Sequence, residues 1–164
     1  MTGAARGIGL ATTRRFLEAG WQVAMLDILG DTLTDAVSTI DRPADTFALQ
    51  ADVSDPQAVQ DAVRRAHRHF GRIDALVNNA GIAIFKPILE VTVEEWNRVL
   101  AVNLTGPFLM VQAVAPLMRD QGGGAVVNIA SISGLRGSTL RVAYGTSKAA
   151  LGHLTRQQAA ELDR

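Results

Sequence analysis

A tyrosine and a lysine in the second half of the chain have the types and spacing needed to move a proton. Tyr144 and Lys148 are four residues apart, so on a helix they leave the same face with Cβ atoms roughly 5–6 Å apart. A fixed ammonium beside a phenol stabilises the phenolate. A phenol stabilised in this way can donate or accept a proton at neutral pH.

Ser131 lies thirteen residues ahead of the tyrosine and directly follows the apolar run 125–130. This run is typical of a buried parallel strand. A hydroxyl at the carboxyl end of such a strand lies at the edge where α/β sheets bind ligands. These features also have a structural explanation, because Tyr144 and Lys148 can be an ordinary helical pair and Ser131 can cap a helix.

The chain opens with a glycine-rich segment, residues 2–9, which leads into a predicted helix at 10–19. Gly3, Gly7 and Gly9 allow tight backbone turns and the close approach of a ligand. The N-terminus of the helix behind them favours a pyrophosphate through its free N–H groups and its dipole. The same pattern also occurs at simple strand-to-helix corners.

The predicted strand at 22–27 ends in Asp27, eighteen residues after Gly9. An acid about 20 residues beyond the glycines is where a Rossmann unit binds the hydroxyls of the adenosine ribose. Asp27 can alternatively cap the next helix. The combination with the glycines favours the ribose role.

The remaining pattern alternates strands with helices. Further strands are predicted at 46–50, 74–78 and 125–130, and helices at 31–40, 56–70, 93–118 and from 143 to the chain end. This alternation predicts an α/β fold with a doubly wound parallel sheet. Asn79, Ala80 and Gly81 follow the strand at 74–78, at the sheet edge that binds ligands. Asn103 interrupts an apolar helix, where a buried amide must find hydrogen-bond partners.

Composition narrows the class of protein. The 164 residues predict one domain, residues 1–164, and 48% hydrophobic residues are ample for a core. Sixteen basic and sixteen acidic side chains balance, which argues against a nucleic-acid or membrane-surface partner. The chain has no cysteine, which excludes thiolate metal sites and fits a cytoplasmic protein. No apolar run is expected to span a membrane.

Together these segments resemble the short-chain dehydrogenase/reductase family over essentially the whole chain. The matching motifs occur in the family's order: Thr2-Gly3-x3-Gly7-Ile8-Gly9, Asp52-Val53, Asn78-Asn79-Ala80-Gly81, Asn103, Ser131 and Tyr144-x3-Lys148. The resemblance implies that Tyr144 is the general acid/base, that Lys148 activates it, and that Ser131 orients the substrate. It also implies that Asn103 holds a water linking Lys148 to solvent.

The resemblance further implies a set of cofactor contacts. These are Gly3, Arg6, Gly7, Ile8, Gly9, Asp27, Asp52, Val53, Asn79, Ala80, Gly81, Tyr144 and Lys148. Asp27 favours NAD, because a 2′-phosphate beside its carboxylate would meet a repulsion of roughly 4 kcal/mol per unit-charge pair at 4 Å and an effective dielectric constant near 20. Arg6 is the counter-argument, since a basic residue there serves the 2′-phosphate of NADP in some members of the family.

The implied activity is that of an NAD(P)-dependent oxidoreductase, which transfers hydride between the cofactor and a secondary alcohol or ketone without a metal. The alternative is an inactive or partial dinucleotide-binding scaffold of the same fold. The family also implies a homo-oligomer, formed through the helices that carry Asn103 and Tyr144.

Parts of the family pattern are missing from this sequence. The glycine motif begins at residue 2, so we expect no strand ahead of it, and the absent strand belongs in the middle of the doubly wound sheet. The later strands and the substrate-binding lid are also absent. We therefore expect an incomplete Rossmann-like fold, truncated at both ends, in which the isolated chain folds poorly or binds cofactor weakly.

Overall fold

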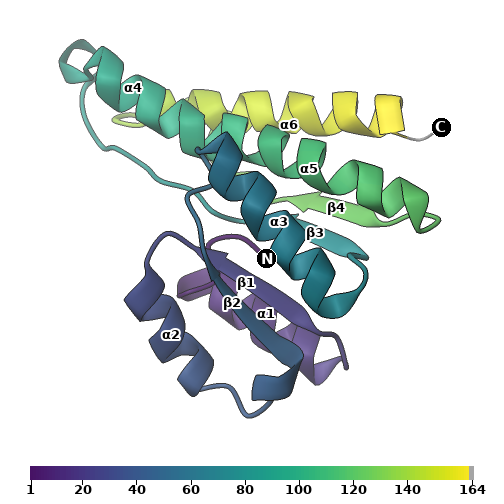
Figure 1. Ribbon diagram of the computed structural model, residues 1–164. Helices are drawn as coiled ribbons and strands as arrows, with labels where there is room; N and C mark the ends of the chain where they lie inside the picture. Colours follow the sequence, from purple (N-terminus) through teal and green to yellow (C-terminus); the bar gives the residue numbers. More distant parts are fainter. Residues whose placement is uncertain (163–164) are drawn as a thin grey trace.

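Strands and helices alternate along the chain, as Figure 1 shows for the computed structural model, which describes residues 1–162. The strands are β1 (Val23–Asp27), β2 (Thr46–Gln50), β3 (Ala75–Asn78) and β4 (Ala125–Asn128). The helices are α1 (Gly7–Glu18), α2 (Gly30–Ser38), α3 (Pro56–Phe70), α4 (Val93–Leu100), α5 (Gly106–Asp120) and α6 (Val142–Leu162). Helix α1 begins three residues earlier than the predicted helix at 10–19, so its first turn includes Gly7 and Gly9.

The strands form two separate parallel pairs, β1 with β2 and β3 with β4. Met1 and Thr2 lie between the pairs and bond to both. Thr2 N–H donates to the Val77 carbonyl at 3.0 Å, and Leu26 N–H donates to the Met1 carbonyl at 2.9 Å. The resulting order, β2-β1-(Met1–Thr2)-β3-β4, is the predicted doubly wound sheet with its middle strand reduced to two residues.

A cavity of about 520 Å³ continues from Met1 between the two strand pairs, with Ala24 and Leu26 on one side and Ala75 and Val77 on the other. Residues alternate their backbone groups between the two edges of a strand. Since Leu26 and Val77 bond to Met1 and Thr2, the backbone groups of Ala24 and Ala75 face this cavity as well. We call this space the strand slot.

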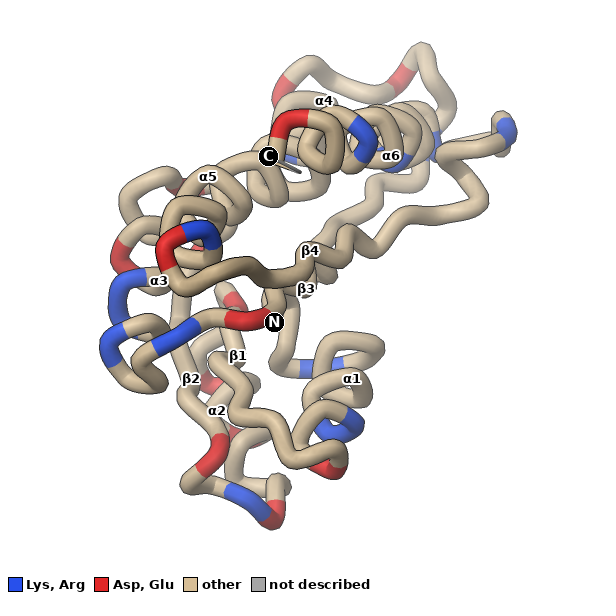
Figure 2. Tube along the Cα trace, turned by 90° about the vertical axis from the view of Figure 1, so that its right-hand side faces the viewer, with Lys and Arg blue, Asp and Glu red and all other residues tan. Residues whose placement is uncertain are grey.

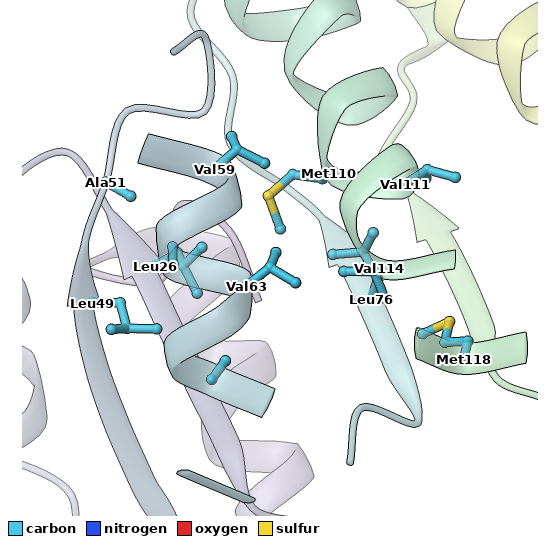
Figure 3. Packing of buried hydrophobic residues seen from close by; sticks show 12 residues of the cluster. Leu26, Leu49, Ala51, Val59, Val63, Leu76, Met110, Val111, Val114 and Met118 are labelled. Atoms are coloured by element: carbon cyan, nitrogen blue, oxygen red, sulfur yellow. The ribbon is translucent and has the colours of Figure 1, made fainter. Parts of the chain in front are cut away.

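Two apolar cores cover the faces of the strands. The larger core joins the strands to α3 and α5, and Figure 3 shows Leu26, Leu76, Val59, Val63 and Met110 meeting there. The smaller core joins β1 to α1 and α2 through buried residues that include Leu17, Met25 and Leu33. Helices on both faces are the expected arrangement for a parallel sheet.

Local signals set several helix ends. The Asp55 side chain accepts N–H bonds from the first turn of α3, Pro56 is its first residue, and Gly71 ends the helix with a left-handed φ of 79°. Thr92 and Glu95 form a reciprocal capping box at α4. Each arrangement satisfies backbone groups that a helix end leaves free.

Strand β4 differs from the prediction of a buried strand at 125–130. It ends at Asn128, its four residues are half-buried or exposed, and the Val127 side chain is 49% exposed. The difference arises because β4 pairs on one edge only, with β3. An apolar run alone cannot distinguish a central strand from an edge strand.

Helices α4 and α5 are continuous through a π-helical turn at Ala101–Thr105. The joined helix, Val93–Asp120, meets the length and composition test for a membrane span with a mean hydropathy of 1.5. This corrects the expectation that no run would reach that length: the predicted helix at 93–118 is continuous through the polar Asn103, and isolated polar residues leave its mean hydropathy high. Its residues Met110, Val111, Val114 and Met118 lie in the larger core, as in the core helix of a globular domain.

Candidate functional site

The glycine-rich segment packs so tightly that side chains are excluded at two positions. A Cβ on Gly9 would lie 1.9 Å from the Gly3 carbonyl oxygen, and one on Gly3 would lie 2.9 Å from the Ala80 Cα. Gly3 also has a positive φ of 63°. Gly7 differs, because its φ is 56° and a Cβ there would meet nothing within 4 Å. The segment therefore has no space for a side chain at Gly3 and Gly9, whereas the space beside Gly7 is empty.

The start of α1 leaves its first N–H groups available. The N-cap residue Arg6 makes no side-chain capping bond, and the first turn has no acidic residue. Ile8 in that turn is 66% exposed. Free N–H groups at a helix N-terminus, with glycines that allow close approach, suit the pyrophosphate of a dinucleotide.

Asp27 lies at the end of β1 and contacts the same segment. Its carboxylate accepts the Ala5 N–H at 2.9 Å through Oδ2 and the Leu29 N–H at 3.1 Å through Oδ1. Both bonds use backbone donors, and Asp27 takes part in none of the ion pairs found within residues 1–162. The acid that was predicted to bind ribose hydroxyls therefore stands beside the glycine-rich segment.

The ends of β2 and β3 supply the other predicted cofactor residues. The Asn79 side chain donates to the Thr2 and Gly3 carbonyls, each at 3.0 Å, and the Thr2 hydroxyl accepts the N–H groups of Asn79 and Ala80. Asp52 is used in a local turn, where it accepts the Ser54 N–H and hydroxyl. Val53 is buried and packs against Gly106, whose Cβ would lie 3.0 Å from the valine methyl.

Tyr144 and Lys148 lie one turn apart on α6. The Lys148 Nζ is 5.9 Å from the centroid of the Tyr144 ring and donates to the Ile129 carbonyl at 2.6 Å. The lysine is only 5% exposed. Burial away from water lowers the pKa of Lys148, because the charged form loses hydration.

Asn103 sits in the π-helical turn and is fully buried. Its Oδ1 accepts the Ile82 N–H at 2.9 Å, and its Nδ2 donates to the Ile82 carbonyl at 2.9 Å and to the Ser147 hydroxyl at 3.0 Å. Ser147 in turn donates to the Tyr144 carbonyl at 2.7 Å. The amide thus ties the segment after β3 to the helix of Tyr144. Single-turn π-helices of this kind are frequent at functional sites.

The segment 79–82 connects the two groups of predicted residues. At its start Asn79 bonds to the glycine-rich segment, and at its end Ile82 bonds to Asn103. Between them, a Cβ on Gly81 would lie 3.3 Å from the Asn103 Oδ1 and 3.7 Å from the Lys148 Nζ. The lysine and the amide therefore meet at Gly81.

Ser131 caps the short turn Ile132–Gly134, where its Oγ accepts the Ser133 N–H at 3.2 Å. This capping bond is the structural explanation considered from the sequence. The turn packs on α6 so closely that a Cβ on Gly134 would lie 2.7 Å from the Lys148 backbone, and one on Gly145 would lie 2.9 Å from the Ser133 carbonyl oxygen. Ser131 is thereby anchored to the part of α6 that carries Tyr144 and Lys148.

Two polar residues of this network were not predicted as site residues. Thr2 connects the glycine-rich segment to Asn79 and Ala80, and Ser147 connects Asn103 to the backbone of Tyr144. Both are fully buried. The available signal for Ser147 was a small polar residue directly before Lys148, which is common at exposed helix positions and therefore weak.

Comparison with known proteins gives consistent matches over this chain. A family model described as short chain dehydrogenase matches residues 1–164. The chain is 43% identical to a 2-(R)-hydroxypropyl-CoM dehydrogenase of Xanthobacter autotrophicus, over 98% of this chain and 66% of the relative. It is 37% identical to a 3-oxoacyl-[acyl-carrier-protein] reductase of Synechocystis, over 99% of this chain and 66% of the relative.

A crystal structure of NAD+-bound xylitol dehydrogenase superposes with a TM-score of 0.94 at 38% identity. It matches 99% of this chain, which covers 63% of that structure. The chain thus spans just under two thirds of the length of the proteins that it matches, and the fold it shares with them is incomplete.

Proposed function

The chain belongs to the short-chain dehydrogenase family, and from that membership we propose that it is an NAD-dependent oxidoreductase acting on a secondary alcohol or ketone. The observation that carries the proposal is the buried Lys148 ammonium on the same helical face as Tyr144. A buried cation beside a phenol serves proton transfer. A scaffold that only binds a dinucleotide has no need of it.

The residues present fit a dinucleotide. The uncapped start of α1 and the open side of Gly7 would hold the pyrophosphate, and Asp27 would accept hydrogen bonds from the adenosine ribose. Asp52 and Val53 would flank the adenine, and the segment from Asn79 to Gly81 would line the cleft. The bound nicotinamide would supply the hydride donor or acceptor that the side chains lack.

Within residues 1–162 Asp27 has no ion-pair partner, which supports NAD over NADP. Its carboxylate contacts two backbone N–H groups, so a 2′-phosphate would meet an uncompensated negative charge. Arg6 is exposed and adjacent to the glycines, which leaves it able to bind a phosphate. Turnover measured with each cofactor decides between them, and a clear preference for NADP would overturn this assignment.

The proposed role of Tyr144 is to hold and move the proton of the substrate oxygen. In the oxidative direction its phenolate takes the proton from the alcohol O–H while the carbon loses hydride, and the reductive direction returns both. Lys148 stabilises the phenolate by its charge. Ser131 would donate a hydrogen bond to the substrate oxygen and orient it, and the predicted water at Asn103 would connect Lys148 to solvent.

The network around Asn103 supports these roles by fixing positions. Because Asn103 bonds to Ile82 and to Ser147, neither the segment after β3 nor the first turns of α6 can shift alone. Pre-positioned groups lower the cost of reaching the reacting geometry. We also propose a cytoplasmic homo-oligomer, supported by exposed apolar side chains on α4 and α5 such as Val93 and Phe108.

Replacement of Tyr144 by phenylalanine tests the proposal. Y144F removes the proton-carrying oxygen and keeps the ring, so turnover of secondary alcohols should fall by about 10²–10⁴-fold. NAD binding, measured by calorimetry, should stay within about twofold of the parent chain. Turnover that survives in Y144F would refute the catalytic role, and the parent chain's failure to turn over any alcohol or ketone would refute the proposed activity.

A further inference from the structure

A second cavity, of about 720 Å³, opens beside the proposed catalytic turn of α6. Its walls are the loop from Ser133 to Arg141, the segment Lys86–Ile88, and the α6 residues Gly145, Thr146 and Ala149. Gly145 and Thr146 directly follow Tyr144. Tyr144 itself does not belong to the lining, but the turn of α6 that carries it forms one wall, so a substrate bound at that turn would have this cavity beside it.

The walls of this cavity are basic. Lys86, Arg136 and Arg141 are the charged residues among them, and no carboxylate belongs to the lining. The sequence contains no acidic residue between Asp120 and Glu161. Lys86 is neutralised by Glu95 at 2.5 Å. Arg136 and Arg141 take part in none of the ion pairs found within residues 1–162.

Of these two arginines, Arg141 lies nearer to Tyr144 in the chain and is the less exposed. It lies three residues before Tyr144, at the entrance of α6, where its carbonyl accepts the Gly145 N–H at 2.7 Å. Arg141 directly precedes the first residue of α6 and so lies within one turn of Tyr144 along the chain. Arg141 is half-buried, whereas Arg136 is exposed.

The backbone before Arg141 is strained in a way that fixes its direction. Leu140 has a φ of 60°, the one positive φ of a non-glycine residue in the described part of the chain. Such a conformation costs free energy and persists where the surroundings require it. Here the Leu140 carbonyl accepts the Lys86 N–H at 3.2 Å. Beside this contact, the Arg141 guanidinium lies 5.0 Å from the centroid of the Phe85 ring.

On the premise of the proposed oxidoreductase activity, we propose that Arg141 binds an anionic group of the substrate and thereby sets its specificity. The substrate class is a secondary alcohol or ketone that carries a carboxylate, sulfonate or phosphonate a few bonds from the reacting carbon. A guanidinium presents a planar fork of donors that matches such oxyanions. The Phe85 ring holds one face of the guanidinium, so its N–H edge stays free for the ligand.

The test compares matched substrates that differ in charge. Levulinate and its methyl ester share a ketone, and acetonylphosphonate supplies a second anionic group. Replacing Arg141 by glutamine should lower kcat/KM for levulinate by about 10–100-fold and leave the methyl ester within about twofold. R141K should restore part of the loss, because it keeps the charge without the fork. R119Q on the exposed end of α5 is the charge-matched control and should change neither substrate.

A binding measurement separates this inference from the proposed activity. Calorimetry should show levulinate or acetonylphosphonate binding to the chain with NAD present, and at least tenfold weaker binding to R141Q. Equal effects of R141Q on levulinate and its ester, or equal anion binding by both chains, would overturn the role of Arg141 and leave the oxidoreductase proposal intact. Anion binding that depends on Arg141 in a chain that reduces no ketone would support the site and refute the activity.

Discussion

At the scale of single residues, the most informative group is the buried ammonium of Lys148. It donates to the Ile129 carbonyl and lies near the Tyr144 ring, yet no carboxylate pairs with it in the described residues. Burial of an unpaired cation is unfavourable for folding. Its retention indicates a role other than stability, and proton transfer with Tyr144 is the role proposed above.

The lowered pKa of Lys148 makes a prediction about stability and pH. The unfolded lysine has a pKa of about 10.4, so between the lower folded pKa and that value the unfolded chain binds more protons. The free energy of unfolding should therefore rise with pH through this window. In K148M this rise should be smaller, and turnover should fall by at least about 100-fold. Urea denaturation followed at pH 7 and pH 10 measures the difference.

The chain's other lysine, Lys86, provides the control. It is paired with Glu95 in a half-buried position, so K86M should keep the pH dependence of the parent chain. Equal pH dependence in K148M and the parent chain would show that Lys148 is not desolvated in solution.

The spacing of the Tyr144–Lys148 pair was easier to predict from the sequence than the contacts of Asn103. The i,i+4 spacing of Tyr144 and Lys148 follows from helix geometry alone and could be read directly. The partners of Asn103 could not, because Ile82 supplies backbone groups and Ser147 belongs to a distant helix. Such pairings depend on tertiary packing, which the order of residue types does not encode locally.

At the scale of elements, the glycine-rich segment and the first turn of α1 form the pyrophosphate part of the proposed cofactor site. The strand and helix order was predictable from the alternation of apolar runs and helical patterns. The start of α1 was not, since Gly7 and Gly9 are poor helix formers and enter the helix because the surrounding backbone holds them. Nor was the edge position of β4 predictable, because it depends on which strands are present beside it.

Two glycine-to-alanine changes, one at the tightly packed Gly9 and one at the open Gly152, test the packing of the glycine-rich segment. In G9A the new Cβ would overlap the Gly3 carbonyl oxygen, 1.9 Å away, so we expect a loss of about 1–3 kcal/mol of stability together with weaker NAD binding. In G152A the Cβ meets nothing within 4 Å and lies inside α6, so helix propensity should raise stability by up to about 1 kcal/mol. Thermal denaturation of both variants gives the comparison, and a G9A chain as stable as G152A would contradict the packing.

At the scale of the whole molecule, the chain consists of two strand pairs, each with its own helices, joined across the middle by Met1 and Thr2 (Figure 1). Acidic and basic residues both occur in each of the two halves (Figure 2). The break between strand pairs was predictable, because the doubly wound order places the missing strand in the middle. The use of Met1 and Thr2 as a bridge was not.

The strand slot predicts an alternating pattern of amide hydrogen exchange. The N–H groups of Ala24 and Ala75 face the slot, while those of Met25 and Leu76 face their paired strands. Unpaired amides exchange faster than paired ones. Amide exchange measured by NMR should therefore be at least about tenfold faster at Ala24 and Ala75 than at their neighbours. Equal protection along β1 and β3 would mean that the two edges are paired in solution.

Met1 belongs to the lining of the strand slot. The Met1 ammonium donates to the Ala24 carbonyl at 3.0 Å, and burial lowers its pKa to about 6. Residues fused ahead of Met1 would enter the strand slot, where the backbone groups of Ala24 and Ala75 face them. The last described residues of α6, Glu161 and Leu162, are exposed and do not line the slot, so an affinity tag attached on that side of the molecule leaves the slot unchanged.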